Sequence, residues 1–365
     1  MERIDLGPVR LTVGQPVQVT AAPGHAWFPV IDRFANGELL ALWSMLPDIH
    51  VFAYQGGVSH STDNGKTWTD PYAVGNWFSV RHLLSDGSLR GVPYYIYPRP
   101  RGQARTLATH LITHFPGGRH EMVPFGVTVT GFPRPLTLHE VGSVAFNFDG
   151  NILDVGGRWL ATMYGWLEGE KLSTLVLLVS RDEGRTWTYE TTIASHADTP
   201  GAPEGPDEAS LVKLEDGDIL CVYRVGSGLS WNYRASRSSD AGRTWSKPEV
   251  LDGPFSVEPC VRRLTNGVLA LSGGRPGLHL WLCTDGKGMR WQEFDVQAYH
   301  NRLCNAAWRM AEDGSQTTAY TEIIEIAPNR LLYLYDRVPL GWQAVPVESD
   351  ERNMIFVLDI TVERR

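Results

Sequence analysis

The sequence has no long apolar run, little cysteine and no surplus of basic charge. None of its apolar stretches approaches the length that crosses a bilayer, so we expect no membrane partner. The formal net charge of −8 disfavours binding to nucleic acid or to an anionic membrane. Residues 1–6 lack the apolar core of a signal peptide, which predicts a cytoplasmic protein; a secreted protein whose signal had been removed would have the same sequence.

The cysteines and histidines of the sequence also lack the spacing of metal ligands. The four cysteines stand at positions that match no zinc signature, and we expect reduced, mostly buried thiols at Cys221, Cys260, Cys283 and Cys304. Four histidines gather in one stretch without a zinc-type spacing, at positions 110, 114, 120 and 139. The sequence therefore implies no metal site and no cofactor.

What the chain does contain is a repeated turn. The pattern S-x-D-x-G-x-T-W occurs at residues 61–68, 180–187 and 238–245, and a degraded copy covers residues 283–291. The aspartate can accept hydrogen bonds from the turn's own N–H groups, the glycine can take positive φ, and the tryptophan offers a large apolar face. The pattern resembles the Asp box of the sialidase superfamily, in which the aspartate serves the fold. The resemblance implies an all-β propeller.

A second repeat supports the same architecture. Asn-Gly or Asp-Gly, typical of hairpin turns, comes before an apolar strand at residues 36, 86, 149, 216 and 266, with a related turn at 328–329. The spacing is long enough for four strands per unit. We therefore predict a single domain over residues 1–365 with six four-stranded antiparallel blades; seven is the alternative if residues 100–165 hold two units. The second blade would lack an Asp box.

Three segments interrupt this pattern, and no helix longer than two turns is expected. Residues 98–105 form a basic stretch that we interpret as a solvated turn. Residues 196–207 are rich in proline, glycine and aspartate and predict a loop on the substrate face. Residues 292–319 form a polar and aromatic insertion that could roof a pocket.

Glu208 and Arg224 are the first candidates for chemistry. Glu208 opens one predicted strand, Arg224 ends the next, and an Asp-Gly turn lies between them, so the two side chains should meet on one face. The segment is similar to a sialidase hairpin, and the resemblance implies that the glutamate activates the nucleophile and the arginine holds a substrate carboxylate. A surface ion pair is the alternative.

Tyr320 and Asp336 belong to a second such hairpin. Residues 319–336 resemble the last active-site hairpin of sialidases, which implies that Tyr320 is the nucleophile and that Asp336 replaces a substrate-contacting glutamate. A phenol has a pKa near 10, so it needs a nearby base before it can attack, and Glu208 would be that base. Taken alone, Tyr320 would more often be a core tyrosine.

At the other expected site positions the resemblance to sialidases is only partial. Arg275, after a Gly-Gly pair, matches a substrate-binding arginine, whereas Trp27 stands where the family keeps another and would offer a sugar an apolar face. Asp48 lies on the loop of the family's acid/base aspartate, and His50 is its neighbour and a second proton-transfer candidate. His139 and Glu140 are candidates of lower rank.

These residues predict a glycoside hydrolase of sialidase type that acts on a carbohydrate, with an acidic sugar favoured by the two arginines. It would retain configuration through a tyrosine-linked intermediate. One alternative is a polysaccharide lyase that abstracts a proton beside a uronate carboxylate. Another is a glycan-binding propeller without turnover, which predicts that Tyr320 and Glu208 do not touch. The sequence does not identify the sugar or the oligomeric state.

Overall fold

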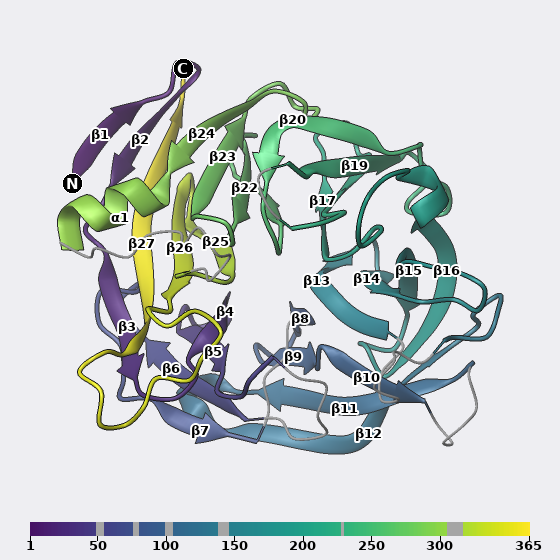
Figure 1. Ribbon diagram of the computed structural model, residues 1–365, viewed down its shortest axis with the longest axis horizontal. Helices are drawn as coiled ribbons and strands as arrows, with labels where there is room; N and C mark the ends of the chain where they lie inside the picture. Colours follow the sequence, from purple (N-terminus) through teal and green to yellow (C-terminus); the bar gives the residue numbers. More distant parts are fainter. Residues whose placement is uncertain (49–54, 76–79, 99–104, 138–145, 228–229, 305–316) are drawn as a thin grey trace.

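Antiparallel sheets follow one another around a central space in the computed structural model, which describes residues 1–48, 55–75, 80–98, 105–137, 146–227, 230–304 and 317–365 (Figure 1). The fold is all-β, as predicted, and is β-propeller-like. The first strand of each unit lies nearest the centre. The strands are short and twisted, as this arrangement requires.

Three of the sheets are simple antiparallel meanders of four strands. Each runs from the centre outward in chain order, and each ends with an Asp-box turn before its last strand. They consist of β4 (Trp27–Arg33), β5 (Leu39–Ser44), β6 (Gly56–Ser61) and β7 (Tyr72–Val74); β17 (Ala209–Lys213), β18 (Ile219–Tyr223), β19 (Asn232–Ser238) and β20 (Glu249–Phe255); and β21 (Cys260–Arg263), β22 (Leu269–Gly273), β23 (His279–Cys283) and β24 (Trp291–Asp295).

Two further meanders fuse into a nine-stranded sheet. Their outer strands pair in parallel at residues 128–130 and 186–188, and a short strand, β10 (Tyr95–Pro98), bridges them. The members are β8 (Val80–Leu83), β9 (Leu89–Val92), β11 (Leu107–His114) and β12 (His120–Thr130), then β13 (Phe146–Asp154), β14 (Trp159–Gly165), β15 (Thr174–Ser180) and β16 (Thr186–Ala194).

The two ends of the chain meet in the last sheet. The C-terminal strand pairs with N-terminal strands on both parts of its length, so the ring is closed by hydrogen bonds between segments far apart in sequence (Figure 1). The sheet contains β25 (Thr321–Ala327), β26 (Arg330–Arg337), β27 (Asn353–Arg364), β1 (Glu2–Asp5), β2 (Val9–Val13) and β3 (Val17–Ala22).

The Asp-box turns are built as the sequence predicts. In the second copy, Asp182 accepts hydrogen bonds from the Thr186 N–H (2.8 Å) and hydroxyl (2.7 Å) and from the Ser180 hydroxyl (2.9 Å). The Trp187 indole N–H donates to the Gly184 carbonyl at 3.0 Å, and the indole packs in the core. The degraded copy keeps this plan, with the Cys283 thiol in place of the serine hydroxyl.

One predicted turn is wrong. Asp149, Gly150 and Asn151 lie inside β13 and do not close a hairpin. Gly150 has a φ of 76°, and the register with β14 shifts between Asp149 and Leu153, so the Asp-Gly pair forms an irregularity within the strand. A side chain at Gly150 would collide with the Ala209 carbonyl, and this close approach requires glycine.

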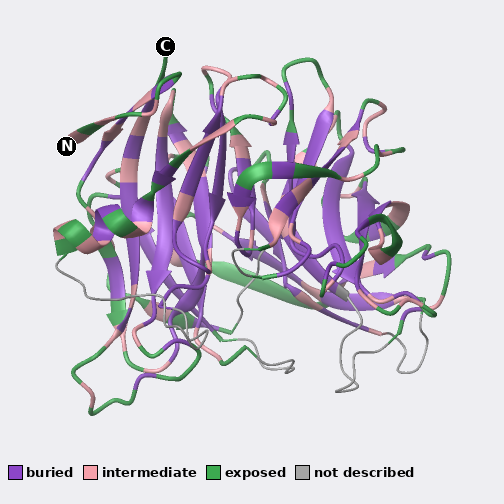
Figure 2. Cartoon of the chain, turned by 45° about the horizontal axis from the view of Figure 1, so that its top comes forward, coloured by how far each residue is buried: buried purple, intermediate pink, exposed green. Residues whose placement is uncertain are grey.

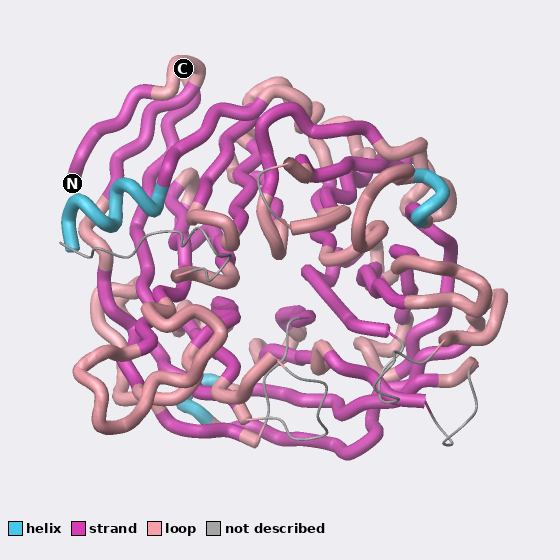
Figure 3. The backbone as a smooth tube through the Cα atoms, in the orientation of Figure 1, coloured by secondary structure: helices cyan, strands magenta, loops and turns pink. Residues whose placement is uncertain are grey.

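Helices are few and peripheral (Figure 3). The helix α1 (Val296–Cys304) exceeds two turns, contrary to the sequence-based expectation. It lies on the outside of the ring, where the Tyr299 hydroxyl donates to the Gly14 carbonyl at 2.8 Å. The described part of the 292–319 insertion therefore does not roof the central face. Short 3₁₀ turns occupy Pro116–Gly118 and His196–Asp198.

The core lies between neighbouring sheets, because each sheet has an apolar face toward the next (Figure 2). Cys221, Cys260 and Cys283 are buried free thiols and Cys304 is exposed, so the predicted burial holds for three of the four. No helix of the described residues is long and apolar enough to cross a membrane. The basic stretch at 98–105 lies largely outside the described residues.

Candidate active site

A cavity of about 460 Å³ opens at one end of the central space. Its walls come from the loops and inner strand ends of several sheets, which is where propellers carry function. The predicted loop at 196–207 contributes Pro203, Glu204 and Asp207 to the wall, in agreement with its expected place on the substrate face.

Tyr320 and Glu208 meet in this cavity. The Tyr320 hydroxyl, just before β25, donates a hydrogen bond to Glu208 Oε1, just before β17. Both residues line the cavity, and the Glu208 side chain is only 2% exposed. A phenol and a carboxylate from distant parts of the chain are thus placed so that the carboxylate can take the phenol's proton.

Arg224 joins Glu208 as the hairpin predicts. The Arg224 N–H donates to the Glu208 carbonyl at 3.1 Å, and the guanidinium Nε lies 2.7 Å from Glu208 Oε2. The same guanidinium pairs with Glu204 at 2.8 Å and with Asp207 at 3.5 Å. Arg224 is therefore enclosed by three carboxylates of its own chain, which occupy the donors that the sequence analysis assigned to a substrate carboxylate.

Burial sets the protonation of these groups. It raises the pKa of the Tyr320 phenol well above its usual value, and the neighbouring Glu208 carboxylate raises it further. The same desolvation raises the pKa of Asp207 to about 7, against the opposing charge of Arg224. Tyr320 is accordingly a neutral phenol at neutral pH, and it can attack only as Glu208 removes its proton.

Asp48 lies at the exposed rim of the same cavity. Its carboxylate accepts a hydrogen bond of 3.3 Å from the Tyr95 hydroxyl. Burial and the Asp48 charge raise the pKa of Tyr95, so this contact keeps a neutral phenol against a solvated carboxylate. Asp48 is therefore on the substrate side of the cavity, apart from the buried Glu208.

Arg275 also lines the cavity. Its backbone N–H donates to the Ala319 carbonyl at 2.9 Å, which fixes it beside the Tyr320 hairpin. Its guanidinium carbon lies 4.5 Å from the centre of the Trp342 ring. Nη1 is buried and has no hydrogen-bond partner among the described residues, so a donor remains unused at the cavity wall.

Trp27 is not a cavity residue, which corrects the sequence-based expectation. The side chain is 1% exposed, and its indole N–H donates to the Leu46 carbonyl at 2.8 Å. Phe28 lines the cavity instead, with its ring stacked on Trp27 at 4.4 Å. The β4–β5 register shifts between Trp27 and Val30, and Phe28 has a φ of 54°, so the local backbone turns Phe28 toward the cavity.

Asp336 is also misassigned as a substrate contact. It is fully buried in β26 and does not line the cavity. Its carboxylate accepts hydrogen bonds from the N–H groups of Phe28 (3.0 Å) and Ala319 (2.6 Å) and a longer one from Tyr320 (3.4 Å). Burial raises its pKa to about 6 despite these bonds. Asp336 holds the Phe28 and Tyr320 segments together from behind.

Three other candidates, His50, His139 and Glu140, lie outside the described residues. Of the other clustered histidines, His110, His114 and His120 do not line the cavity.

Sequence reasoning missed an aromatic wall. Tyr94, Tyr95 and Tyr164 line the cavity, and the Tyr94 and Tyr164 hydroxyls are hydrogen-bonded to each other. The adjacent tyrosines at 94–95 are the available signal in the sequence, because two large aromatic rings lie together beside a predicted inner strand. Such rings can stack on the C–H faces of a sugar.

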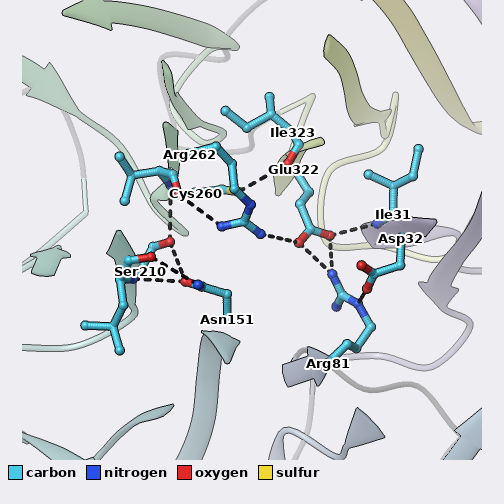
Figure 4. Close-up of polar contacts among 11 residues, drawn as sticks. Ile31, Asp32, Arg81, Asn151, Ser210, Cys260, Arg262, Glu322 and Ile323 are labelled. Atoms are coloured by element: carbon cyan, nitrogen blue, oxygen red, sulfur yellow. Dashed lines mark hydrogen bonds and ion pairs between the residues drawn. The ribbon is translucent and has the colours of Figure 1, made fainter. Parts of the chain in front are cut away.

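Below the cavity, charged side chains connect the inner strands of different sheets (Figure 4). Arg81 pairs with Asp32 and, at 2.5 Å, with Glu322. Glu322 also accepts from the Ile31 N–H at 2.7 Å and pairs with Arg262 at 3.3 Å. We call Asp32, Arg81, Arg262 and Glu322 the channel belt. Its charges balance, and it fixes the strands that carry the site.

Comparison with known proteins agrees with this architecture. Residues 154–343, more than half of the chain, match the BNR repeat-like domain family. Among curated proteins, none matches the chain.

Solved structures resemble the chain along nearly its whole length. A Dyadobacter fermentans protein of unknown function has 20% identity and a TM-score of 0.70, covering 97% of this chain and 99% of its own. The α-L-arabinanase of Penicillium chrysogenum, complexed with arabinobiose, has 18% identity and a TM-score of 0.62, and the match covers 95% of this chain and 98% of the arabinanase. The intramolecular trans-sialidase of Ruminococcus gnavus has 14% identity and a TM-score of 0.54, and the match covers 94% of this chain and 96% of the trans-sialidase. At these identities the likeness establishes the fold.

Proposed function

The chain belongs to the BNR repeat-like domain family, and from this membership and the chemistry of the cavity we propose that it is a glycoside hydrolase. The observation that carries the proposal is the hydrogen bond from the Tyr320 hydroxyl to Glu208 beside a sugar-sized cavity. The bond argues against a glycan-binding protein without turnover, which predicts that these two groups lie apart. We also infer one domain of six blades, because the nine-stranded sheet divides into two four-stranded meanders.

The proposed reaction has two steps. In the first, the Tyr320 oxygen attacks the anomeric carbon while its proton moves to Glu208, and the glycosidic bond breaks as Asp48 protonates the leaving oxygen. In the second, Asp48 removes a proton from water, the water oxygen attacks the anomeric carbon, and Tyr320 leaves and recovers its proton from Glu208. Two inversions give net retention of configuration.

We propose a neutral sugar as substrate, in place of the acidic sugar that the sequence favours. The acidic preference depended on two arginines, and Arg224 already pairs with Glu204, Asp207 and Glu208. A substrate carboxylate there would meet three negative charges at close range. The cavity supplies tyrosine rings and the unused Arg275 donor, which suit hydroxyl groups. The similar Penicillium arabinanase is complexed with arabinobiose, a neutral disaccharide.

The lyase alternative is supported by one observation, the unpaired Arg275 Nη1, which could bind a uronate carboxylate. The two reactions give different products. A lyase forms a new C=C bond that absorbs in the ultraviolet, whereas a hydrolase forms a reducing end without it.

The test is a screen of neutral and acidic aryl glycosides and oligosaccharides with the wild type, Tyr320→Phe and Glu208→Gln. We expect turnover of a neutral glycoside, retention by NMR of the first-formed product, and a loss of roughly 10²–10⁴-fold in kcat/KM for each variant. Tyr299→Phe is the matched control, because it removes a phenol hydroxyl far from the cavity. Wild-type activity in either cavity variant, or ultraviolet-absorbing products, would contradict the proposal.

A further inference from the structure

Two carboxyl groups that the proposed reaction does not use lie directly behind Glu208. Asp149, in β13, accepts a 2.9 Å hydrogen bond from the Ala209 N–H, the residue after Glu208. Glu258, between β20 and β21, donates its backbone N–H to Glu208 Oε2 at 2.9 Å. The two residues thus hold Glu208 from β13 and from the β20–β21 loop, through its neighbour's peptide and through its own carboxylate.

The carboxyl groups of Asp149 and Glu258 each leave one oxygen without a donor. Asp149 Oδ1 and Glu258 Oε2 are both buried and accept no hydrogen bond from a donor group of the described residues. Asp149 is 1% exposed, so water does not compensate at its surface. The two carboxyl groups are within hydrogen-bonding reach of each other. A proton between them satisfies both oxygens, whereas two ionised groups would repel.

Acidic and neutral groups outnumber the cations around the pair. Burial raises the pKa of both carboxyl groups well above their ordinary values, and each group and Glu208 raise it further. The acidic groups that face the pair are Glu208, Asp207 and Glu322, and the phenols of Tyr94, Tyr164, Tyr233 and Tyr320 lie nearby. Of the nearby cations, Arg224 pairs with Glu204, Asp207 and Glu208. Arg262 pairs with Glu322 and lines a small pocket together with Glu258.

We propose that Asp149 and Glu258 share one proton at neutral pH and act as positioning residues that hold the Glu208 carboxylate toward Tyr320. The pair then carries one negative charge and not two, and the Glu258 N–H stays directed at Glu208 Oε2. The sharing of the proton is supported by the two buried carboxyl oxygens that lack a donor; its catalytic consequence rests on the proposed function.

The consequence concerns the position of Glu208. A pair that carries one negative charge repels the Glu208 carboxylate less than a pair that carries two. The pair therefore stays in place behind the site, and the Ala209 peptide and the Glu258 N–H keep the Glu208 carboxylate directed at Tyr320.

The first test uses no substrate. Infrared difference spectra at neutral pH, wild type minus Glu258→Gln and wild type minus Asp149→Asn, should each show the C=O band of a protonated carboxyl that the variant lacks. Asparagine at 149 retains an oxygen for the Ala209 N–H, so the fold is preserved. Glu293→Gln, at an exposed glutamate, is the control and should change only carboxylate bands. No protonated band in either difference spectrum would overturn the shared proton.

The second test measures the charge effect. In Asp149→Asn/Glu258→Gln the pair carries no charge, so we expect the acidic limb of kcat/KM to lie about one pH unit lower than in the wild type. Each single variant keeps one charge and should leave the limb in place. If the double variant does not fold, the Glu258→Gln spectrum still decides whether the proton is shared.

These outcomes separate the two proposals. If the wild type turns over no glycan but the infrared bands behave as expected, the proposed function fails and the shared proton stands. If the wild type is active but the acidic limb of kcat/KM is the same with and without the pair, the pair has no influence on the reaction, and this inference fails while the proposed function stands.

Discussion

Arg224 controls the charge of the cavity floor at the scale of single residues. Burial alone would lower its pKa, but Glu208, Asp207 and Glu204 raise it well above its ordinary value. The three carboxylates depend on this one cation in return. Ligand binding and the ionisation of the cavity floor are therefore coupled at Arg224, because a ligand that displaced one carboxylate would change the ionisation of the others.

Removal of this cation should have a large effect. In Arg224→Gln, the buried carboxylates lose their counter-charge, so we expect stability to fall by about 3–5 kcal/mol. The acidic limb of kcat/KM should also move to higher pH, because the cavity loses the positive charge that favours ionised carboxylates. Urea unfolding and a pH–rate profile measure the two effects. Arg234→Gln, whose guanidinium donates to the Asn232 carbonyl, is the control; an Arg224 variant as stable as this control would refute the prediction.

Asp207 makes stability depend on pH. Its folded pKa of about 7 lies above the model-peptide value of 3.8, so the folded state binds a proton that the unfolded state releases. The contribution of Asp207 is fully present below about pH 4 and is lost as pH rises through about 7. Asp207→Asn should remove this part of the pH dependence. Thermal unfolding between pH 4 and pH 8 measures it, and parallel curves for the two proteins would contradict the assignment.

At the scale of the element, the Asp box is a turn whose side-chain hydrogen bonds replace backbone ones. We expect Asp182→Ala to lower the free energy of unfolding by about 1–2 kcal/mol, because the Thr186 and Ser180 groups lose their acceptor. Asp216→Ala, in an exposed turn with one bond to the Asp218 N–H, is the control and should cost less. Equal losses in urea unfolding would show that the box adds nothing beyond an ordinary turn.

The stability that the Asp-box turns contribute should also depend on acidic pH. Hydrogen bonds from Thr67 and Ser61 outweigh desolvation and lower the pKa of Asp63 to about 2. Because the pKa of Asp63 is lower in the folded protein than the ordinary value of 3.8, the ionised carboxylate stabilises the fold above about pH 4. This stabilisation is lost as the pH falls toward 2. Asp63→Asn should therefore narrow the stability difference between pH 5 and pH 2. Circular dichroism at the two pH values measures it, and an unchanged difference would exclude the box as a source of acid sensitivity.

Elements differ in how far the sequence predicts them. Glu208 and Arg224 are predictable because a tight hairpin fixes which residues are opposite each other. Tyr320 is predictable only through the resemblance of its hairpin to that of sialidases. Trp27 is not, because a register shift beside Phe28 decides which ring faces the cavity, and no local signal marks it. The Asp149-Gly150 pair is indistinguishable from a turn by composition, yet it lies inside β13 against Ala209. Contacts between sheets decide these cases.

At the scale of the whole molecule, the ring is held by contacts between its inner strands as well as by the pairing of its ends. Ser210 links β17 to its neighbours, since its hydroxyl donates to Asn151 in β13 at 2.9 Å and accepts from the Val261 N–H in β21 at 3.1 Å (Figure 4). The channel belt continues the circuit through β25, β4 and β8. Because Tyr320 directly precedes β25 and Glu208 directly precedes β17, this circuit fixes their separation.

Glu322 is the residue on which this circuit depends most. Its side chain is 8% exposed, and it receives Arg81, Arg262 and the Ile31 N–H from three other inner strands. In Glu322→Gln the amide can still accept from Ile31, but Arg81, 3% exposed, loses one of its two carboxylates. We expect a loss of about 3–5 kcal/mol in the free energy of unfolding, as for other broken buried pairs.

Arg262→Ala is the control for Glu322→Gln, because it removes only the partly exposed ion pair of the channel belt and leaves the buried Arg81–Glu322 pair intact. Its side chain is 28% exposed, so its pair with Glu322 should contribute at most about 1 kcal/mol. Because Glu322 shares β25 with the residues that follow Tyr320, Glu322→Gln should also lower kcat more than it raises KM, whereas Arg262→Ala should leave both close to wild type. Urea unfolding gives the stability of each variant, and steady-state kinetics give its kcat and KM. If both variants lose the same small amount of stability, the inner strands are held by their apolar packing, and the belt does not position the site.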